Sequence, residues 1–78
     1  MKNSIQNPEK GIALYYQVEN SIREKIENGE WKVGQKLPTE PELCQFFGVS
    51  RTTVRQAVDS LVTSGLLAKK QGSGTYVT

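Results

Sequence analysis

The chain has 78 residues and a mass of 8.7 kDa, which is the size of one small domain. Hydrophobic residues make up 36% and charged residues 23%, a balance that is ordinary for globular domains and argues against a disordered tail. The lack of histidine removes the most common general base and metal ligand, and a single cysteine excludes an intramolecular disulfide or a Cys-x-x-Cys site. We therefore expect neither an enzyme nor a bound metal or cofactor.

The net charge of +2 is unevenly distributed along the chain. Residues 1–48 hold six Lys/Arg and seven Asp/Glu, whereas residues 49–78 hold four Lys/Arg and one acid, Asp59. This asymmetry indicates an anionic partner for the C-terminal part. No apolar run approaches the roughly 20 residues of a membrane span, and the first twenty residues lack a signal-peptide core. We expect a cytoplasmic protein.

The first predicted elements are a flexible arm over 1–11 and a helix over 12–28. The helix places apolar residues on one inward face: Leu14, Tyr15, Val18, Ile22 and Ile26. Its charged residues are expected on a solvated face: Glu19, Arg23, Glu24 and Glu27. Gly29 ends the helix, and the connector 29–38 is expected to pack on the core through Trp31, Val33 and Leu37, with a short edge strand at 36–37.

A capping box then predicts a second helix, because Thr39 and Glu42 have the S/T-x-x-E spacing and Pro41 is tolerated in the first turn. Its apolar stripe is Leu43, Phe46 and Phe47, and Gly48 stops it. Ser50 is the predicted N-cap of a third helix over 51–63, and Gly65 closes that helix. The third helix has the cleanest apolar period of the chain: Val54, Ala57, Val58, Leu61 and Val62.

Two short strand candidates, 66–70 and 75–78, follow, and the glycine-bearing loop 71–74 joins them into a hairpin. Two helices joined by a tight turn form a helix-turn-helix, and a terminal hairpin makes it a winged helix, an α+β fold. In this motif the second helix enters the major groove of DNA. Here its outward face would present Thr52, Gln56 and Thr63, with Arg55 on the flank and Arg51 at the tip, side chains suited to base edges and phosphates.

The motifs in this order resemble the DNA-binding domain of GntR-family bacterial transcription regulators. The resemblance is carried by the runs 36–40, 42–43, 47–57, 64–67 and 71–77, and the match as a whole covers about Ile12 to Val77. The HutC-type branch is the most similar, because of Leu14-Tyr15-Tyr16-Gln17 and the Gln-Gly-Ser-Gly-Thr wing. The chain departs from the pattern at Pro41, where many members carry an arginine, so any DNA contact made there by relatives is in doubt here.

The resemblance implies contacts to bases or phosphates from Arg51 and Arg55, phosphate contacts around Thr39, Ser50 and Thr53, and insertion of the wing into the minor groove. Together with the residue chemistry it gives the full candidate DNA-binding set: Thr39, Ser50, Arg51, Thr52, Thr53, Arg55, Gln56, Lys69, Lys70, Gln71, Gly72, Ser73, Gly74 and Thr75. It also implies a dimeric parent repressor that binds a two-fold symmetric operator, with a metabolite-binding C-terminal domain beyond this chain. The domain by itself is expected to be a weakly binding monomer cut from that longer protein.

Simpler structural roles remain open for several of these residues. Arg55 could form an ion pair with Asp59 one turn on, and Lys69 and Lys70 could protect a strand edge from aggregation. Gly72 and Gly74 could serve only the turn, and Thr39 and Ser50 could serve only as caps. Cys44 is expected to be a core or boundary residue, and Trp31 and Tyr76 are expected to fill the core. The alternative function is a winged helix that binds an acidic protein partner rather than DNA.

Overall fold

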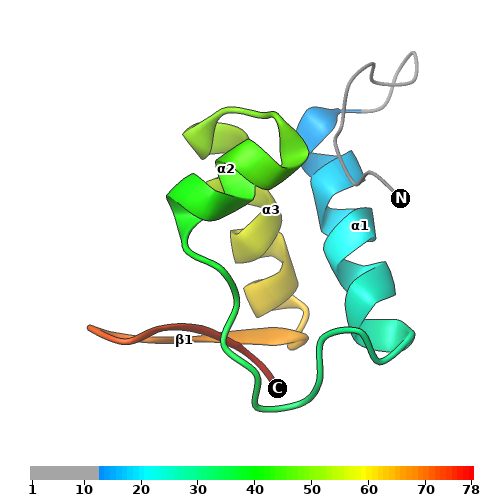
Figure 1. Ribbon diagram of the computed structural model, residues 1–78, viewed down its shortest axis with the longest axis vertical. Coiled ribbons are helices and arrows are strands. Elements are labelled where there is room, and N and C mark those ends of the chain that lie inside the picture. The colour runs from blue at the N-terminus through cyan, green and yellow to red at the C-terminus, as the bar shows by residue number, and fades with distance from the viewer. Residues whose placement is uncertain (1–12) are drawn as a thin grey trace.

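The computed structural model describes residues 13–78, which form three helices and a two-stranded antiparallel hairpin (Figure 1). The elements are α1 (Leu14–Glu27), α2 (Glu40–Phe47), α3 (Arg51–Thr63), β1 (Leu67–Lys70) and β2 (Gly74–Val77). The predicted winged helix-turn-helix is confirmed. The arm predicted over 1–11, and the first predicted helical residue, Ile12, lie outside the described residues.

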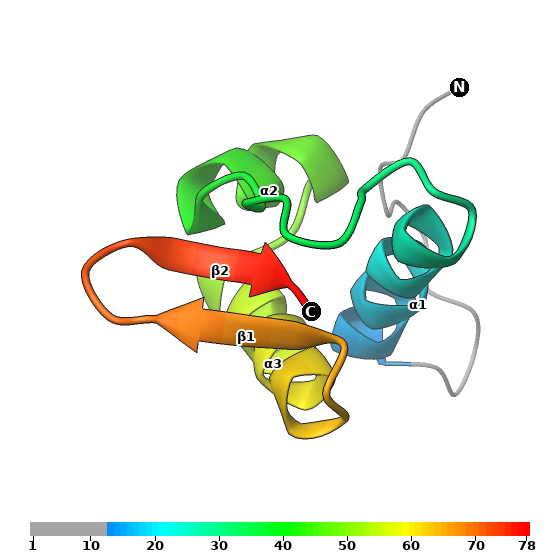
Figure 2. The same cartoon turned by 90° about the horizontal axis from the view of Figure 1, so that it is seen from below.

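The core lies where the three helices and the hairpin meet. α1 and α3 run side by side, α2 packs on α3, and the hairpin lies across the C-terminal end of α3, with its loop pointing away from α1 (Figures 1 and 2). Every element contributes buried apolar side chains to one cluster: Val18, Ile22, Leu37, Leu43, Phe47, Val54, Ala57, Val58, Leu61, Leu67 and Val77. The third helix is thereby held with one face buried and the opposite face exposed.

The turn between α2 and α3 is short because Gly48 adopts a left-handed conformation, φ +70°, that other residues rarely take. Its N–H donates to the Cys44 carbonyl (2.8 Å), which ends α2, and Ser50 then caps α3. The bounds of α3 agree with the predicted 51–63. β1 begins one residue later than predicted, and β2 begins and ends one residue earlier, since the ladder pairs Leu67 with Val77 and Lys70 with Gly74.

The predicted edge strand at 36–37 is reduced to a single bridge, between Lys36 and Tyr76. Leu37 donates its N–H to the Thr75 carbonyl (2.8 Å), but the next residue, Pro38, has no N–H with which to continue a ladder. This bridge ties the connector to β2, which lies between the connector and β1 (Figure 2). It therefore fixes the wing relative to the start of α2.

Four side-chain placements differ from the prediction. Tyr15 and Phe46, predicted to face inward, are 39% and 42% exposed, and Val33 is 79% exposed on a turn of the connector. Tyr15 lies at the rim of a hollow bounded by α3, and the short α2 buries one side of its stripe, leaving Phe46 edge-on against Phe47. Conversely, Glu19 is buried although it was predicted to be solvated, because its carboxylate pairs with Arg23 at 2.8 Å. Val62, predicted to face inward, is half-buried and packs against the core.

Candidate nucleic-acid interface

Two hydroxyls of the predicted site cap the N-termini of α2 and α3. Thr39 Oγ1 accepts from the Glu42 N–H (3.3 Å), and Glu42 Oε1 accepts from the Thr39 N–H (2.8 Å), so the predicted capping box is complete. These bonds to Thr39 hold the pKa of Glu42 below its ordinary value. Ser50 Oγ accepts from the Thr53 N–H (3.2 Å) and also lies 3.0 Å from the Thr53 hydroxyl. The first turns of α2 and α3 are thus capped by side chains, with hydroxyl groups at their N-termini.

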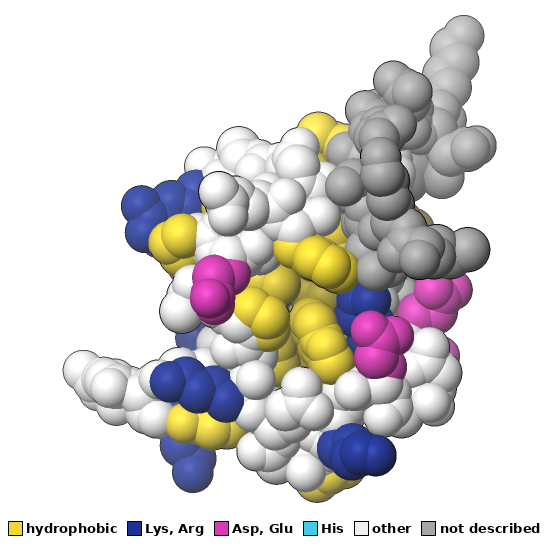
Figure 3. All heavy atoms as spheres, in the orientation of Figure 1, with side chains coloured by type: hydrophobic (Ala, Val, Ile, Leu, Met, Phe, Trp, Pro, Cys, Tyr) yellow, Lys and Arg dark blue, Asp and Glu magenta, His cyan; other side chains and the backbone are white. Residues whose placement is uncertain are grey.

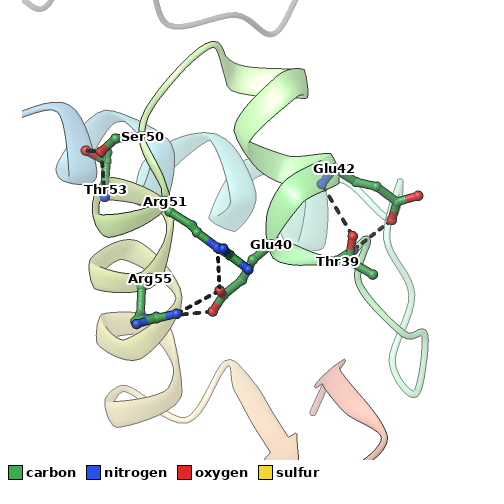
Figure 4. A network of polar contacts seen from close by, with 7 residues as sticks. All are labelled: Thr39, Glu40, Glu42, Ser50, Arg51, Thr53 and Arg55. Carbon is green, nitrogen blue, oxygen red and sulfur yellow. Dashed lines mark hydrogen bonds and ion pairs between the residues drawn. The ribbon is translucent and has the colours of Figure 1, made fainter.

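The two arginines of α3 converge on Glu40, the first residue of α2 (Figure 4). Arg55 donates from Nη2 to Oε1 (3.1 Å) and from Nε to Oε2 (3.4 Å), whereas Arg51 Nε lies 3.7 Å from Oε1. The hydrogen bond from Arg55, with the nearby charges of both arginines, lowers the pKa of Glu40, and the same bond raises the pKa of Arg55. The ion pair between Arg55 and Asp59 that the sequence left open does not form: Arg55 pairs with Glu40 instead.

The wing carries its basic residues close to α3. Lys69 Nζ lies 2.6 Å from Asp59 Oδ1, an exposed ion pair that joins β1 to α3. Lys70 Nζ lies 5.2 Å from the centre of the Tyr76 ring, and the Tyr76 hydroxyl meets that of Ser73 in the loop. Tyr76, predicted as a core filler, therefore also shapes the wing from a half-buried position.

A cleft of about 350 Å³ separates the wing from the start of α2 and α3. It brings together five of the predicted residues from three segments of the chain: Thr39, Arg51, Ser73, Gly74 and Thr75. Lys36 also lines it, and a Cβ placed on Gly74 would lie 2.7 Å from Lys36 Cε, so glycine lets the strand approach the lysine stem. The sequence prediction left out Lys36 and Glu40. Their position in the run 36–40, which carries the family resemblance, was the available signal.

The remaining predicted residues lie around this cleft rather than in it. Thr52 and Gln56 are exposed on α3, as is Thr63 near its end, and Thr53 is half-buried. Gln71 and Gly72 are exposed at the tip of the wing. The structure thus places the predicted residues on α3, on the wing and, for Thr39, at the start of α2.

A larger hollow of about 690 Å³ lies between the end of α1, the connector and α2. Hydrophobic side chains form its floor (Figure 3), among them Trp31, Leu37 and Phe46. Lys25 is 4% exposed beside it, with its ammonium 3.2 Å from Glu30 and over the rings of Trp31 and Phe46. None of the residues that line this hollow comes from α3 or the wing, but it adjoins the cleft at the start of α2, where both are lined by Lys36, Leu37, Pro38 and Thr39.

Comparison with known proteins identifies the family of this fold. The model of "Bacterial regulatory proteins, gntR family" matches residues 14–77. The chain belongs to this family. It is 43% identical over 72 residues to the HTH-type transcriptional repressor NagR of Bacillus subtilis, covering 92% of this chain and 30% of that protein. It is 56% identical over 64 residues to the mannosyl-D-glycerate transport/metabolism system repressor MngR of Escherichia coli, covering 82% of this chain and 27% of that protein.

Solved structures agree with this assignment. AraR(DBD) in complex with operator ORE1 superposes with a TM-score of 0.91 at 40% identity, covering the whole of both chains. YtrA from Sulfolobus acidocaldarius, a GntR-family transcription factor, superposes with a TM-score of 0.86 at 33% identity, covering all of this chain and 81% of that one. The gntR-family chain described here is thus a winged helix-turn-helix of a regulatory protein rather than an enzyme. It spans about three tenths of the length of its curated relatives. Within residues 13–78, no helix is long and apolar enough to cross a membrane.

Proposed function

We propose that this domain binds duplex DNA with sequence preference as the DNA-binding part of a bacterial transcription repressor. The observation that carries the proposal is the cleft in which Thr39, Arg51 and the wing residues 73–75 meet. A phosphate strand that follows the cleft would place the exposed face of α3 against the major groove and the wing loop against the adjacent minor groove. AraR(DBD), which has the same fold, forms a complex with its operator, and this supports DNA binding by the present domain.

The residues divide into two roles in this arrangement. Arg55, Gln56 and Thr52 lie on the exposed face of α3 and have the donors, acceptors and methyl group that contact base edges. The phosphate contacts come from the helix N-termini and the wing, from Thr39, Ser50, Arg51, Thr53, Lys69, Lys70, Gln71, Gly72, Ser73, Gly74 and Thr75. Hydroxyls and backbone N–H groups at a helix N-terminus suit an anion, and a small loop can approach the sugar–phosphate backbone closely.

We place the chain in the HutC-type branch of the family, in a dimeric, cytoplasmic parent that binds a two-fold operator and responds to a metabolite. The relatives NagR and MngR, both called repressors, are more than three times as long as the matched segment, which leaves room in them for further domains. A dimer fits this fold because each subunit supplies one recognition helix, and the two helices of a dimer bind two half-sites one helical turn of DNA apart. Gel filtration of the full-length protein with and without operator DNA tests the dimer.

The central test measures binding of the domain to duplexes over a salt series. A preferred duplex is selected from a random-sequence library, and its affinity is compared with that of a shuffled duplex between about 50 and 200 mM salt. We expect affinity to fall steeply with salt, because phosphate contacts release counterions. Arg55→Ala should reduce the preference for the selected duplex, whereas Lys70→Ala should weaken both duplexes alike and flatten the salt slope by about one.

Lys32→Ala is the matched control for Lys70→Ala, since Lys32 is an exposed cation on the connector and lines neither the cleft nor α3. It should leave affinity and slope nearly unchanged. Affinity that does not respond to salt, or no binding at low salt, refutes DNA binding and favours the alternative of a protein-binding winged helix. The polar face of α3 argues against that alternative, since the centres of protein interfaces are enriched in aromatic residues and depleted in charge.

A further inference from the structure

The Glu40 carboxylate occupies one particular edge of the Arg55 guanidinium. The bonds run from Nε to Oε2 and from Nη2 to Oε1, which is the side-on arrangement, and they use two of the five N–H donors of the group. The three remaining donors include one N–H on each terminal nitrogen, and these two point away along the end of the side chain. Arg55 is 58% exposed, so this end-on pair is open to solvent.

The end-on pair can contact guanine, since O6 and N7 of that base accept two parallel N–H bonds from an arginine in the major groove. A carboxylate behind the guanidinium leaves this pair free and fixes the plane in which it lies. It also lowers the attraction of the guanidinium for a phosphate, because a negative charge lies 3.1 Å from the same group. The arrangement favours a neutral base edge over the sugar–phosphate backbone.

Arg51 is held differently by the same carboxylate. Its Nε lies 3.7 Å from Oε1, beyond hydrogen-bond distance, and its side chain is 65% exposed. Its donors are therefore free to turn toward the cleft beside the wing, which Arg51 itself lines. One carboxylate at the start of α2 thus orients Arg55 tightly and Arg51 loosely.

We propose that Glu40 is a specificity-determining residue, which positions Arg55 for bidentate contact with a base and discourages its contact with phosphate. This proposal rests on the proposed DNA binding and deepens it. Pro41 follows Glu40 in the first turn of α2, and its fixed backbone helps to hold the carboxylate at this point. A residue from outside the third helix would therefore set what that helix recognises.

The test compares wild type with Glu40→Gln, because the amide keeps the shape but loses the second acceptor oxygen and the charge. The measured quantity is the ratio of affinities for the selected duplex and a shuffled duplex. We expect this ratio to fall by about tenfold, the range of one bidentate base contact, while affinity for the shuffled duplex stays the same or rises. A smaller folded fraction lowers both affinities by one factor and cancels in the ratio.

Two controls isolate the route through Arg55. Glu27→Gln makes the same change of charge at an exposed position in the last turn of α1 and should leave the ratio unchanged. In an Arg55→Ala background, Glu40→Gln should cause no further fall. An unchanged ratio in Glu40→Gln, or an equal fall with and without Arg55, overturns the proposal. A wild-type ratio of one overturns the proposed function itself, so the two failures are distinguishable.

Discussion

Replacing Thr39 with alanine separates two roles that one hydroxyl can hold together. Thr39 Oγ1 accepts the Glu42 N–H at 3.3 Å to cap α2, which leaves its own proton free to donate to a phosphate in the cleft. Loss of an N-cap costs about 0.5–2 kcal/mol. Here we expect about 1 kcal/mol, because the reciprocal bond from Thr39 N–H to Glu42 survives and water can reach the exposed N–H of Glu42.

The size of the domain converts this loss into a melting temperature. Unfolding entropy of about 2.1 cal/mol/K per residue over residues 13–78 gives about 0.14 kcal/mol/K, so Tm should fall by about 7 °C. Thermal unfolding followed by circular dichroism measures this. Affinity for the selected duplex, measured well below Tm, should fall by about tenfold because a hydrogen bond to a charged acceptor is lost. Thr39→Ser should restore both values.

The two measurements fail independently. A Tm within about 2 °C of wild type shows that the hydroxyl does not stabilise α2 as the capping geometry requires. A lower Tm with unchanged affinity shows that the hydroxyl caps α2 and contacts no phosphate, which would remove Thr39 from the proposed interface. An affinity loss in Thr39→Ser as large as in alanine would assign the effect to the γ-methyl group instead.

Three further predictions concern the scaffold. Gly74→Ala should destabilise the wing by about 1–3 kcal/mol in denaturant unfolding, because the φ angle at this position is +149°. A Lys36→Ala background removes the 2.7 Å contact between the new Cβ and Lys36 Cε, but it should recover little of the lost stability because the backbone strain remains. Leu61→Ala should cost about 2–5 kcal/mol, a large part of the about 3–5 kcal/mol that a core of this size supplies, so the denaturant midpoint followed by circular dichroism at 25 °C should fall by about half or more. The pKa values of Glu40 and Glu42 are lowered from 4.5 in the folded domain, so both ionised carboxylates stabilise the fold above that pH. Tm should therefore drop as the pH falls below 4.5 and through the lowered pKa values. Glu42→Gln should reduce this drop.

The helix ends were predictable because they depend on residues within one turn of each other. Thr39 with Glu42, Ser50 with Thr53, and the left-handed Gly48 each fix a boundary through local backbone bonds. These contacts repeat the spacing visible in the sequence. The order of elements, and hence the winged fold, followed from them and from the apolar period of α3.

The ion pairs were not predictable in the same way. The pair between Arg55 and Glu40 joins residues fifteen positions apart and exists because α2 crosses α3 at its N-terminal end. From sequence, the local partner of Arg55 was Asp59, which the structure pairs with Lys69 of the wing. Burial of Glu19 and Lys25 was missed for a related reason, since long side chains lay their stems along apolar surface while the charge finds a partner.

These pairings change what the uneven charge of the sequence means. The basic C-terminal part is partly neutralised in the free domain, because Glu40 faces Arg51 and Arg55 while Asp59 faces Lys69. The pair between Lys69 and Asp59 is exposed and worth about 0–1 kcal/mol, so a phosphate can displace Asp59 at little cost. The side-on pair at Arg55 need not break, because its free donors suffice for a base. Salt should therefore weaken the phosphate contacts of the wing before it weakens the discrimination that Arg55 provides, and the ratio of affinities for selected and shuffled duplexes should persist at salt concentrations where both affinities have fallen.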